Sequence, residues 1–313
     1  MPVPDSVREF VQQLDLEKLR VRRPVPTIFL CGGVIAPHAA GPHYSLRSHI
    51  HHVLGDKLGA PIALAEAATD IFELSEYNDL ISFEGDVAAL SGLTVIICES
   101  PGSLAELGAF AFHNDLSRKL YVLLERGHYD GGGSQSFIRR GPVLRLEKIS
   151  DELVGAFSWD KIKRDGRITS TSFRKIKSDL ASHIRSRIQA GSSLFENGRV
   201  DHRGIALFWI ARLMGGATPA ELKDAISDFG VALTREDTHR LCYSMKALGW
   251  LDELNAGSRY FFPLIDQDPF DYAFRANVSR PSATDWKFVV GREMGKGRWR
   301  RPADVRDRMD QLT

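Results

Sequence analysis

The chain has 313 residues, of which 43% are apolar and 26% are charged, a composition of globular proteins that excludes disordered and collagen-like chains. No stretch of eighteen uninterrupted apolar residues occurs, so the sequence predicts no membrane span. The net charge of +1 hides an asymmetry: residues 1–150 hold 14 Lys/Arg and 18 Asp/Glu, whereas residues 151–313 hold 27 and 22. A polyanionic partner, if there is one, is therefore expected on the C-terminal half.

Residues 1–24 predict an N-terminal amphipathic helix that opens with a Ser6–Glu9 capping box. The next segment, residues 25–150, alternates strand and helix patterns. Strands are predicted at 27–33, 61–64, 93–98, 119–124 and 143–146, and helices at 45–58, 70–83 and 104–114. Such alternation predicts an α/β domain with a doubly wound parallel sheet, whose ligand-binding loops 31–47, 99–106 and 125–135 meet at the carboxyl ends of the strands.

The pattern changes after residue 150. Residues 151–198 predict a basic helical connector, and residues 266–313 predict a basic C-terminal tail. Between them, residues 199–265 contain three helix patterns followed by two short strands around an Asn-Ala-Gly-Ser turn. Three helices and a hairpin are typical of a winged helix, so the second domain is expected to be mainly helical.

The most informative stretch is ESPGSLAELG (99–108), which joins the strand at 93–98 to a helix N-terminus. Backbone N–H groups and the helix dipole favour anions at such a turn. Glu99 is a candidate for contact with the substrate. Gly102 permits close approach of a ligand, Ser103 can contact a ligand oxygen, and Glu106 faces the same crevice. The spacing also allows a purely structural interpretation, in which Ser103 and Glu106 form a capping box and Glu99 stabilises the helix N-terminus.

The segment DVAALSGLTVIICESPGSLAELGAFA (86–111) resembles the central signature of the nucleoside 2-deoxyribosyltransferase family, and IFLCGG (28–33) resembles its first strand. The resemblance covers roughly residues 25–150. It implies that Glu106 is the nucleophile that attacks the anomeric carbon of an N-glycoside, and that Asp86 positions or protonates the substrate. Ser100-Pro101 stands where the family often has an acid. This departure affects two properties that the resemblance would otherwise imply: the base specificity and the transfer of the sugar to a second nucleobase.

Cleavage of an N-glycosidic bond builds oxocarbenium character on the sugar, which a carboxylate stabilises or captures. A cationic leaving group such as the nicotinamide of NAD needs no strong general acid. A chain without the expected acid can therefore still cleave NAD. We expect NAD as the substrate and no cofactor.

Three further residues are candidates for substrate binding. Arg47 could clamp a phosphate, although such an arginine is often only solvated. Gly32 and Gly33 end the first strand in a tight turn at the ligand edge, but the pair is too short for a dinucleotide-binding GxGxxG motif. The histidines between residues 38 and 52 lack the spacing of a metal motif, so no metal site is expected.

The C-terminal half carries candidate contacts to nucleic acid. The third helix of a winged helix enters the major groove, and a basic wing adds contacts. In GREMGKGRWRR (291–301), five basic residues accompany one acid and a tryptophan that could stack on a base. A solvated basic tail is the alternative. The candidates are Arg235, Arg240, Lys246, Arg259, Arg298, Trp299, Arg300 and Arg301.

A deoxyribosyltransferase-like domain joined to a winged helix resembles the toxin effectors of retron antiphage systems. The resemblance implies a toxin that a reverse transcriptase and its msDNA with linked noncoding RNA hold inactive until phage infection. Two alternatives stay open: a nucleoside or nucleotide deoxyribosyltransferase or hydrolase, and a non-catalytic nucleotide-sensing DNA-binding regulator. The three widely spaced cysteines favour the reducing cytoplasm, and we expect an oligomer without membrane contact.

Overall fold

The computed structural model describes residues 3–130, 136–160, 163–188, 191–297 and 301–312. The chain divides into two compact units. The sheet unit comprises Pro26–Thr69 and Ser91–Gln189, and the winged-helix unit comprises Met1–Val25, Asp70–Leu90 and Ala190–Thr313.

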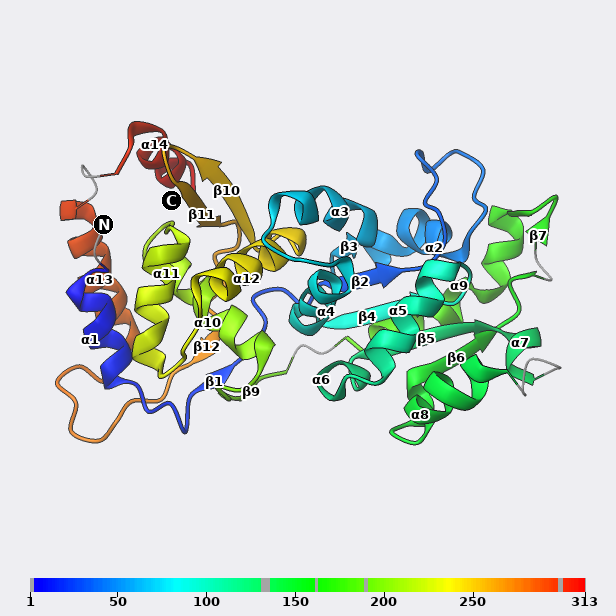
Figure 1. Ribbon diagram of the computed structural model, residues 1–313, viewed down its shortest axis with the longest axis horizontal. Helices are drawn as coiled ribbons and strands as arrows, with labels where there is room; N and C mark the ends of the chain where they lie inside the picture. Colours follow the sequence, from blue (N-terminus) through cyan, green and yellow to red (C-terminus); the bar gives the residue numbers. More distant parts are fainter. Residues whose placement is uncertain (1–2, 131–135, 161–162, 189–190, 298–300, 313) are drawn as a thin grey trace. The chain divides into compact units, whose positions relative to one another are not determined.

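The sheet unit is built on a five-stranded parallel sheet with the strand order β3-β2-β4-β5-β6 (Figure 1). Its strands are β2 (Ile28–Cys31), β3 (Ile62–Leu64), β4 (Leu93–Ile97), β5 (Leu120–Glu125) and β6 (Val154–Phe157). Its helices are α2 (Leu46–His49), continued by π-helical η1 (Ile50–Leu54) and 3-10 helix η2 (Gly55–Lys57), then α5 (Pro101–Ala111), α6 (Asn114–Ser117), α7 (Arg126–Asp130), η4 (Arg139–Val143), α8 (Leu144–Glu147), η5 (Asp151–Leu153) and α9 (Ser170–Arg185). A short hairpin, β7 (Lys163–Arg164) and β8 (Arg167–Ile168), precedes α9.

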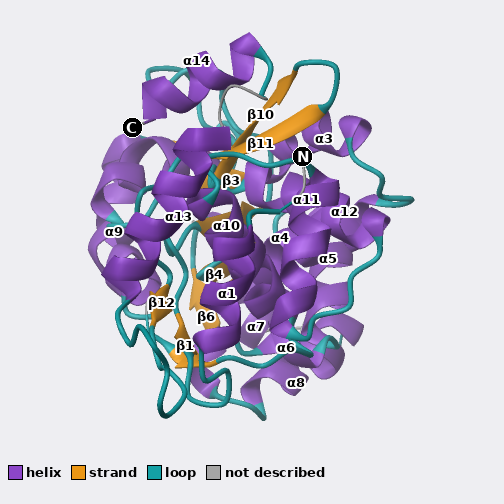
Figure 2. Ribbon diagram, turned by 90° about the vertical axis from the view of Figure 1, so that its left-hand side faces the viewer, coloured by secondary structure: helices purple, strands orange, loops and turns teal. Residues whose placement is uncertain are grey.

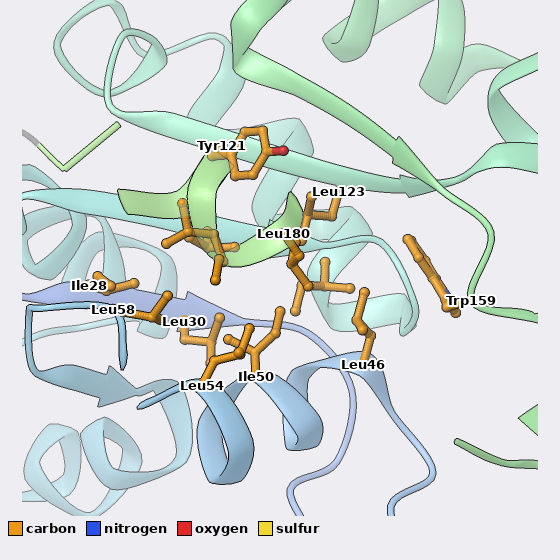
Figure 3. Packing of buried hydrophobic residues seen from close by; sticks show 14 of the residues in the cluster. Ile28, Leu30, Leu46, Ile50, Leu54, Leu58, Tyr121, Leu123, Trp159 and Leu180 are labelled. Atoms are coloured by element: carbon orange, nitrogen blue, oxygen red, sulfur yellow. The ribbon is translucent and has the colours of Figure 1, made fainter. Parts of the chain in front are cut away.

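Helices cover both faces of this sheet. On one face, α2, η1 and α9 pack against alternate strand residues, as Figure 3 shows for Leu46, Ile50 and Leu180. On the other face, α5 contacts β4 and β5. Strands buried on both sides read as continuous apolar runs, which is why β4 and β5 were recognisable in the sequence. The predicted doubly wound α/β architecture is confirmed.

The winged-helix unit contains three consecutive helices followed by an antiparallel hairpin. The helices are α10 (Val200–Leu213), α11 (Pro219–Ile226, followed by the 3-10 turn η7, Ser227–Phe229) and α12 (Arg235–Ala247), and the hairpin pairs β10 (Leu251–Asn255) with β11 (Arg259–Pro263). An isolated bridge joins Ala217 to Phe261 of the hairpin. The predicted winged helix is confirmed.

Further elements surround this core. They are α1 (Asp5–Gln13), α4 (Leu80–Leu90), α13 (Ala283–Gly297), α14 (Ala303–Leu312) and the small sheet of β1 (Arg20–Val21), β9 (Ser193–Leu194) and β12 (Phe270–Asp271). Helix α1 packs on α13, and α14 lies beside the hairpin in both ribbon views (Figures 1 and 2). Helix α3 (Ala65–Leu74) crosses the division between the two units.

Some predicted elements and boundaries differ from the structure. The boundary at residue 150 is displaced because β6 lies beyond it and pairs with β5. Residues 151–198 are therefore only partly a helical connector. Residues 143–146, predicted as a strand, are helical. The single helix predicted over 70–83 is two helices in the structure: α3 ends at Leu74, and α4 starts at Leu80 and runs on through Gly85. Helix α4 packs on α10 and α12 and so joins the winged-helix unit.

Among the described residues, no helix combines the length and the apolar character that a membrane crossing requires.

Candidate active site

The order of the strands identifies the edge of the sheet where a ligand is expected. From β2 the chain moves to β3 on one side, and it then returns to place β4 on the other side of β2. The loops that leave β2 and β4 consequently diverge at the carboxyl ends of these two neighbouring strands. Such a topological switch point is the usual ligand site of an open α/β sheet. Both loops carry residues that the sequence singled out.

Glu99, directly after β4, fastens the loop that follows β2. Its carboxylate accepts backbone hydrogen bonds from Gly33 (3.1 Å), Leu46 (2.8 Å) and Arg47 (3.0 Å). Burial raises the pKa of this carboxyl, and the three backbone N–H groups oppose the rise. Glu99 therefore accepts hydrogen bonds from the N-terminal N–H groups of α2, and its contacts to this loop support a structural role instead of the predicted substrate contact.

Gly33 has no room for a side chain, because a Cβ there would lie 2.9 Å from the Ser45 Cβ and 3.1 Å from the Glu99 Cγ. At Gly32, a Cβ would lie 3.1 Å from the Arg47 Cβ. The two glycines thus permit the loop to pack closely against Glu99 and Arg47. Their described backbone bonds are to protein groups, so the structure assigns them the turn and leaves a substrate contact as a prediction.

Arg47 is buried, and its guanidinium binds the carboxyl end of β2 and the loop that follows it. It donates to the carbonyls of Leu30 (3.0 Å) and Gly33 (3.2 Å), and it forms a bidentate ion pair with Glu66 at 2.5 and 2.6 Å. These bonds use Nε and both terminal nitrogens. Arg47 therefore differs from the predicted phosphate clamp: its donors are already engaged by the protein.

Helix α5 begins one turn earlier than the sequence suggested. Ser100 is the N-cap, and Ser100 and Ser103 form a reciprocal capping box, so the predicted box between Ser103 and Glu106 is wrong. Pro101 occupies the first turn, where its missing N–H is not needed. Gly102 is open to solvent, since a Cβ there would meet only the Ser100 Oγ at 4.0 Å. The first turn of α5 thus has space for a ligand beside it.

With the cap at Ser100, Glu106 lies in the second turn of α5. It falls between Ser103 and Phe110, on the strip of the helix that faces inward, and it is partly buried. Burial, followed by the charges of Glu99 and Glu106, raises the pKa of the Cys98 thiol to about 12. The Glu106 carboxylate therefore lies near Cys98, which directly follows β4. A carboxylate on the inward strip of a helix is unusual unless it is paired or has a chemical role. Because Glu106 does not cap α5, its position is compatible with a catalytic role.

The histidines near the site form a cluster of tilted rings that bond to backbone carbonyls. The ring of His43 lies 4.3 Å from that of His49 and 5.3 Å from that of His52. His49 bonds to the Ile168 carbonyl, and His52 bonds to the Ala36 carbonyl. These contacts fasten the loop after β2. In the described part of the chain, no group of three or more His, Cys, Asp or Glu could hold a metal ion.

Asp86, the second predicted catalytic residue, belongs to the winged-helix unit. It lies on α4, where its carboxylate accepts a hydrogen bond from the Tyr77 hydroxyl at 2.5 Å. The same hydroxyl lies 2.9 Å from the Ser244 Oγ of α12. Burial raises the pKa of the Asp86 carboxyl. These contacts give Asp86 a structural role, and none of them supports the predicted role beside Glu106.

This buried link gives a testable expectation for Tyr77. Replacing Tyr77 by phenylalanine should lower the free energy of unfolding by about 2 kcal/mol, because the Asp86 carboxylate loses its hydroxyl donor in a buried place. Urea denaturation followed by tryptophan fluorescence measures the effect. Tyr44→Phe, at an exposed position, is the control and should change the free energy by less than about 0.5 kcal/mol. Equal stability of the two variants would contradict the structural role of the link.

The basic residues of α12 and the wing are mostly engaged by the protein itself. Arg240 donates to the Glu76 carbonyl and lies over the Tyr77 ring, and Arg259 donates to the Leu74 carbonyl. Lys246 lies 3.7 Å from the Glu253 carboxylate. The segment between α3 and α4 thus lies against the helix and wing that were predicted to bind nucleic acid. Among those candidates on α12 and the wing, Arg235 is exposed and forms no ion pair among the described residues.

The predicted basic tail is also different. Arg298, Trp299 and Arg300 lie outside the described residues, and their contact with nucleic acid stays a prediction. Arg301 is buried and forms an ion pair with Glu221 of α11 at 2.9 Å. It is therefore a core residue and not an exposed contact to nucleic acid. Sequence reasoning missed Glu66, Tyr77 and Glu221 as partners, because each meets its cation or carboxylate only through the fold.

Comparison with known proteins shows which family this chain resembles. Residues 43–253 match the family model of the STM3845 retron effector protein, which is more than half of the chain. The chain belongs to this family of retron effectors. It is 31% identical over 137 residues to the Escherichia coli protein named "Retron Ec86 putative ribosyltransferase/DNA-binding protein", covering 44% of this chain and 42% of that protein. The corresponding protein of retron Ec73, also from Escherichia coli, is 31% identical over 93 residues, covering 30% and 28%.

The alignments with these two relatives span less than half of each relative's own length. Their printed names combine a ribosyltransferase with DNA binding.

Proposed function

We propose that this retron effector is an N-glycosidase that hydrolyses NAD to nicotinamide and ADP-ribose, with Glu106 as the carboxylate at the anomeric carbon. The observation that supports it is the place of Glu106, on the inward strip of a helix that starts at the switch point between β2 and β4. The names of the two relatives, which include ribosyltransferase, agree with chemistry at a ribosyl carbon.

The reaction needs few groups. The bond between C1′ of the ribose and the nicotinamide nitrogen breaks, and its electron pair leaves with nicotinamide, which departs neutral. The Glu106 carboxylate stabilises the oxocarbenium character at C1′ or bonds to it. Water then adds to C1′, the proton goes to solvent, and the carboxylate is restored. The departing base needs no proton. This is consistent with Ser100 and Pro101 at the place where nucleoside 2-deoxyribosyltransferases often have an acid.

The fold around Glu106 prepares the site. Glu99 and Arg47 hold the loop after β2 in one conformation, and the open first turn of α5 offers the Gly102 backbone N–H and the helix dipole to the phosphates of a dinucleotide. Nucleosides without phosphates would not use this turn. NAD therefore fits the arrangement better than a free nucleoside.

Purified full-length effector incubated with NAD tests the proposal. Free nicotinamide and ADP-ribose are expected in equal amounts by liquid chromatography, whereas a mixture of deoxyadenosine and free cytosine should show no base exchange. Exchange of bases would favour the deoxyribosyltransferase alternative. Binding of NAD without release of nicotinamide would favour the nucleotide-sensing regulator, and either result would contradict the proposal.

We further propose that a reverse transcriptase and its msDNA with linked RNA hold this effector inactive in the cytoplasm until phage infection, and that the effector is oligomeric in that assembly. Membership of a retron effector family supports association with retron components. Co-purification of the tagged effector with the reverse transcriptase and msDNA of its own retron tests this association.

A further inference from the structure

The sheet unit carries a row of cations that has no part in the chemistry proposed above. Arg174, Lys177 and Arg185 lie on α9 at positions i, i+3 and i+11, which share one face of a helix. Lys57 of η2 joins them, because the Arg185 guanidinium donates to the Lys57 carbonyl at 3.0 Å. In the described ranges, none of these four cations forms an ion pair with a carboxylate. The row is thus left without internal neutralisation.

Two of these cations are crowded together. Lys177 lies close to Lys57, and this interaction, together with the charge of Arg174, lowers the pKa of the Lys177 amine. Folding gains nothing from two like charges in contact. Such an arrangement is explained when an anion that lies between the amines stabilises both, as a phosphate group would.

The acidic groups nearby face elsewhere. Asp179, the acid of α9, lies on another strip of the helix, where it lines a pocket of about 910 Å³ against β6 together with His183 and Ser186. Asp56 lines a different pocket with Gly59 and Pro61. The positive strip is therefore not a mixed-charge solvated surface but a face of one sign.

The length of the strip distinguishes between anions. Eleven residues of α-helix separate Arg174 from Arg185, which corresponds to about 16 Å along the axis. A single phosphate cannot reach both ends, whereas one nucleic-acid strand presents a charge about every 3.4 Å. No large apolar side chain is exposed on the described part of α9, so the strip lacks the apolar partner of a membrane-surface helix.

We propose that the strip formed by Lys57, Arg174, Lys177 and Arg185 binds the phosphodiester backbone of a nucleic-acid strand, so that the sheet unit itself holds nucleic acid. The inference deepens the proposed association with retron nucleic acid and rests on it for the choice of ligand. It assigns a contact to the unit that carries Glu106, whereas the winged-helix residues Arg240 and Arg259 are engaged by the protein.

The test compares two double variants of the full-length effector that lose the same charge. Lys57→Gln/Lys177→Gln removes the crowded pair, and Lys148→Gln/Lys175→Gln removes exposed lysines of the same unit outside the strip. Binding of a fluorescein-labelled thymidine 30-mer is followed by fluorescence anisotropy at several KCl concentrations. We expect the first variant to bind at least about five-fold more weakly at 100 mM KCl, with a log–log salt slope shallower by about 1.4. The control should change affinity less than about two-fold.

Further measurements keep the result interpretable. The melting temperature of Lys57→Gln/Lys177→Gln should not fall, because the variant removes a repulsion, and its release of nicotinamide from NAD in the absence of nucleic acid should match the unmodified effector. If the unmodified effector releases no nicotinamide from NAD, the proposed function is contradicted, but the comparison of affinities for the 30-mer still tests the strip. Equal affinities of the two double variants would overturn the proposal. So would displacement of the 30-mer by 1 mM inorganic phosphate, or loss of binding to phosphatidylserine vesicles instead of the 30-mer.

Discussion

Replacing Glu106 by glutamine is expected to lower the rate of nicotinamide release from NAD by about 1,000-fold or more. Glutamine keeps the shape of the side chain and its place on the inward strip of α5, but it removes the negative charge that meets the developing positive charge at C1′. Liquid chromatography of nicotinamide measures the rate, and growth of cells that express the variant should be unimpaired.

A matched control separates this effect from a general loss of charge. Glu152→Gln removes an exposed carboxylate of the same unit, and activity should stay within about two-fold of the unmodified effector. Because both changes leave the buried core untouched, their melting temperatures should agree. Activity of Glu106→Gln within tenfold of the unmodified protein would contradict the assignment of Glu106 as the catalytic carboxylate.

Replacing Arg301 by alanine is expected to destabilise the winged-helix unit by about 3–5 kcal/mol. Arg301 and Glu221 are both buried, with side-chain exposures of 1% and 3%, and the variant leaves the carboxylate without its cation. Urea denaturation followed by the fluorescence of the buried Trp209 and Trp250 measures the change. Arg308→Ala, which breaks a partly exposed pair with Asp252, is the control and should cost about 0.5 kcal/mol.

The same pair predicts a dependence of stability on pH. Burial alone would raise the pKa of the Glu221 carboxyl, but hydrogen bonds from Arg301 and Thr218 lower it below its usual value of 4.5. A carboxyl whose pKa is lower in the folded state contributes stability above its unfolded pKa and loses it as the pH falls through the folded pKa. Stability of the unmodified protein should therefore decline below about pH 4.5, and the decline should be smaller in Arg301→Ala. Equal free energies of unfolding of Arg301→Ala and Arg308→Ala would contradict the assignment of Arg301 and Glu221 as a buried ion pair.

The sequence determined the local architecture of this retron effector because the signals are short-range. The apolar runs of β4 and β5 each depend on residues within one element, and each was found where predicted, whereas the predicted Ser6–Glu9 capping box is wrong, because Pro4 is the N-cap of α1. The alternation of strands and helices fixed the doubly wound sheet, and the three helices with a hairpin fixed the winged helix.

Only the tertiary structure decided which side chains meet. Arg47 resembles any solvated arginine until the fold brings Glu66 to it, and Arg301 resembles a basic tail until it packs against α11. Helix α4 follows the predicted domain in sequence, yet its contacts with α10 and α12 place Asp86 in the winged-helix unit.

The turn after β4 shows both limits. Its residues alone identified the ligand edge and Glu106, since a strand, a glycine and a helix start are local signals. They could not decide between Ser100 and Ser103 as the cap, because both are competent hydroxyl donors and acceptors and only the backbone conformation selects one. In the same way the net charge of +1 revealed an acidic half and a basic half, but pairing across the fold decided which cations stay free. Among the described residues, the four cations of the strip on α9 and η2 form no ion pair with a carboxylate, whereas most of the candidate cations on α12 bond to protein groups.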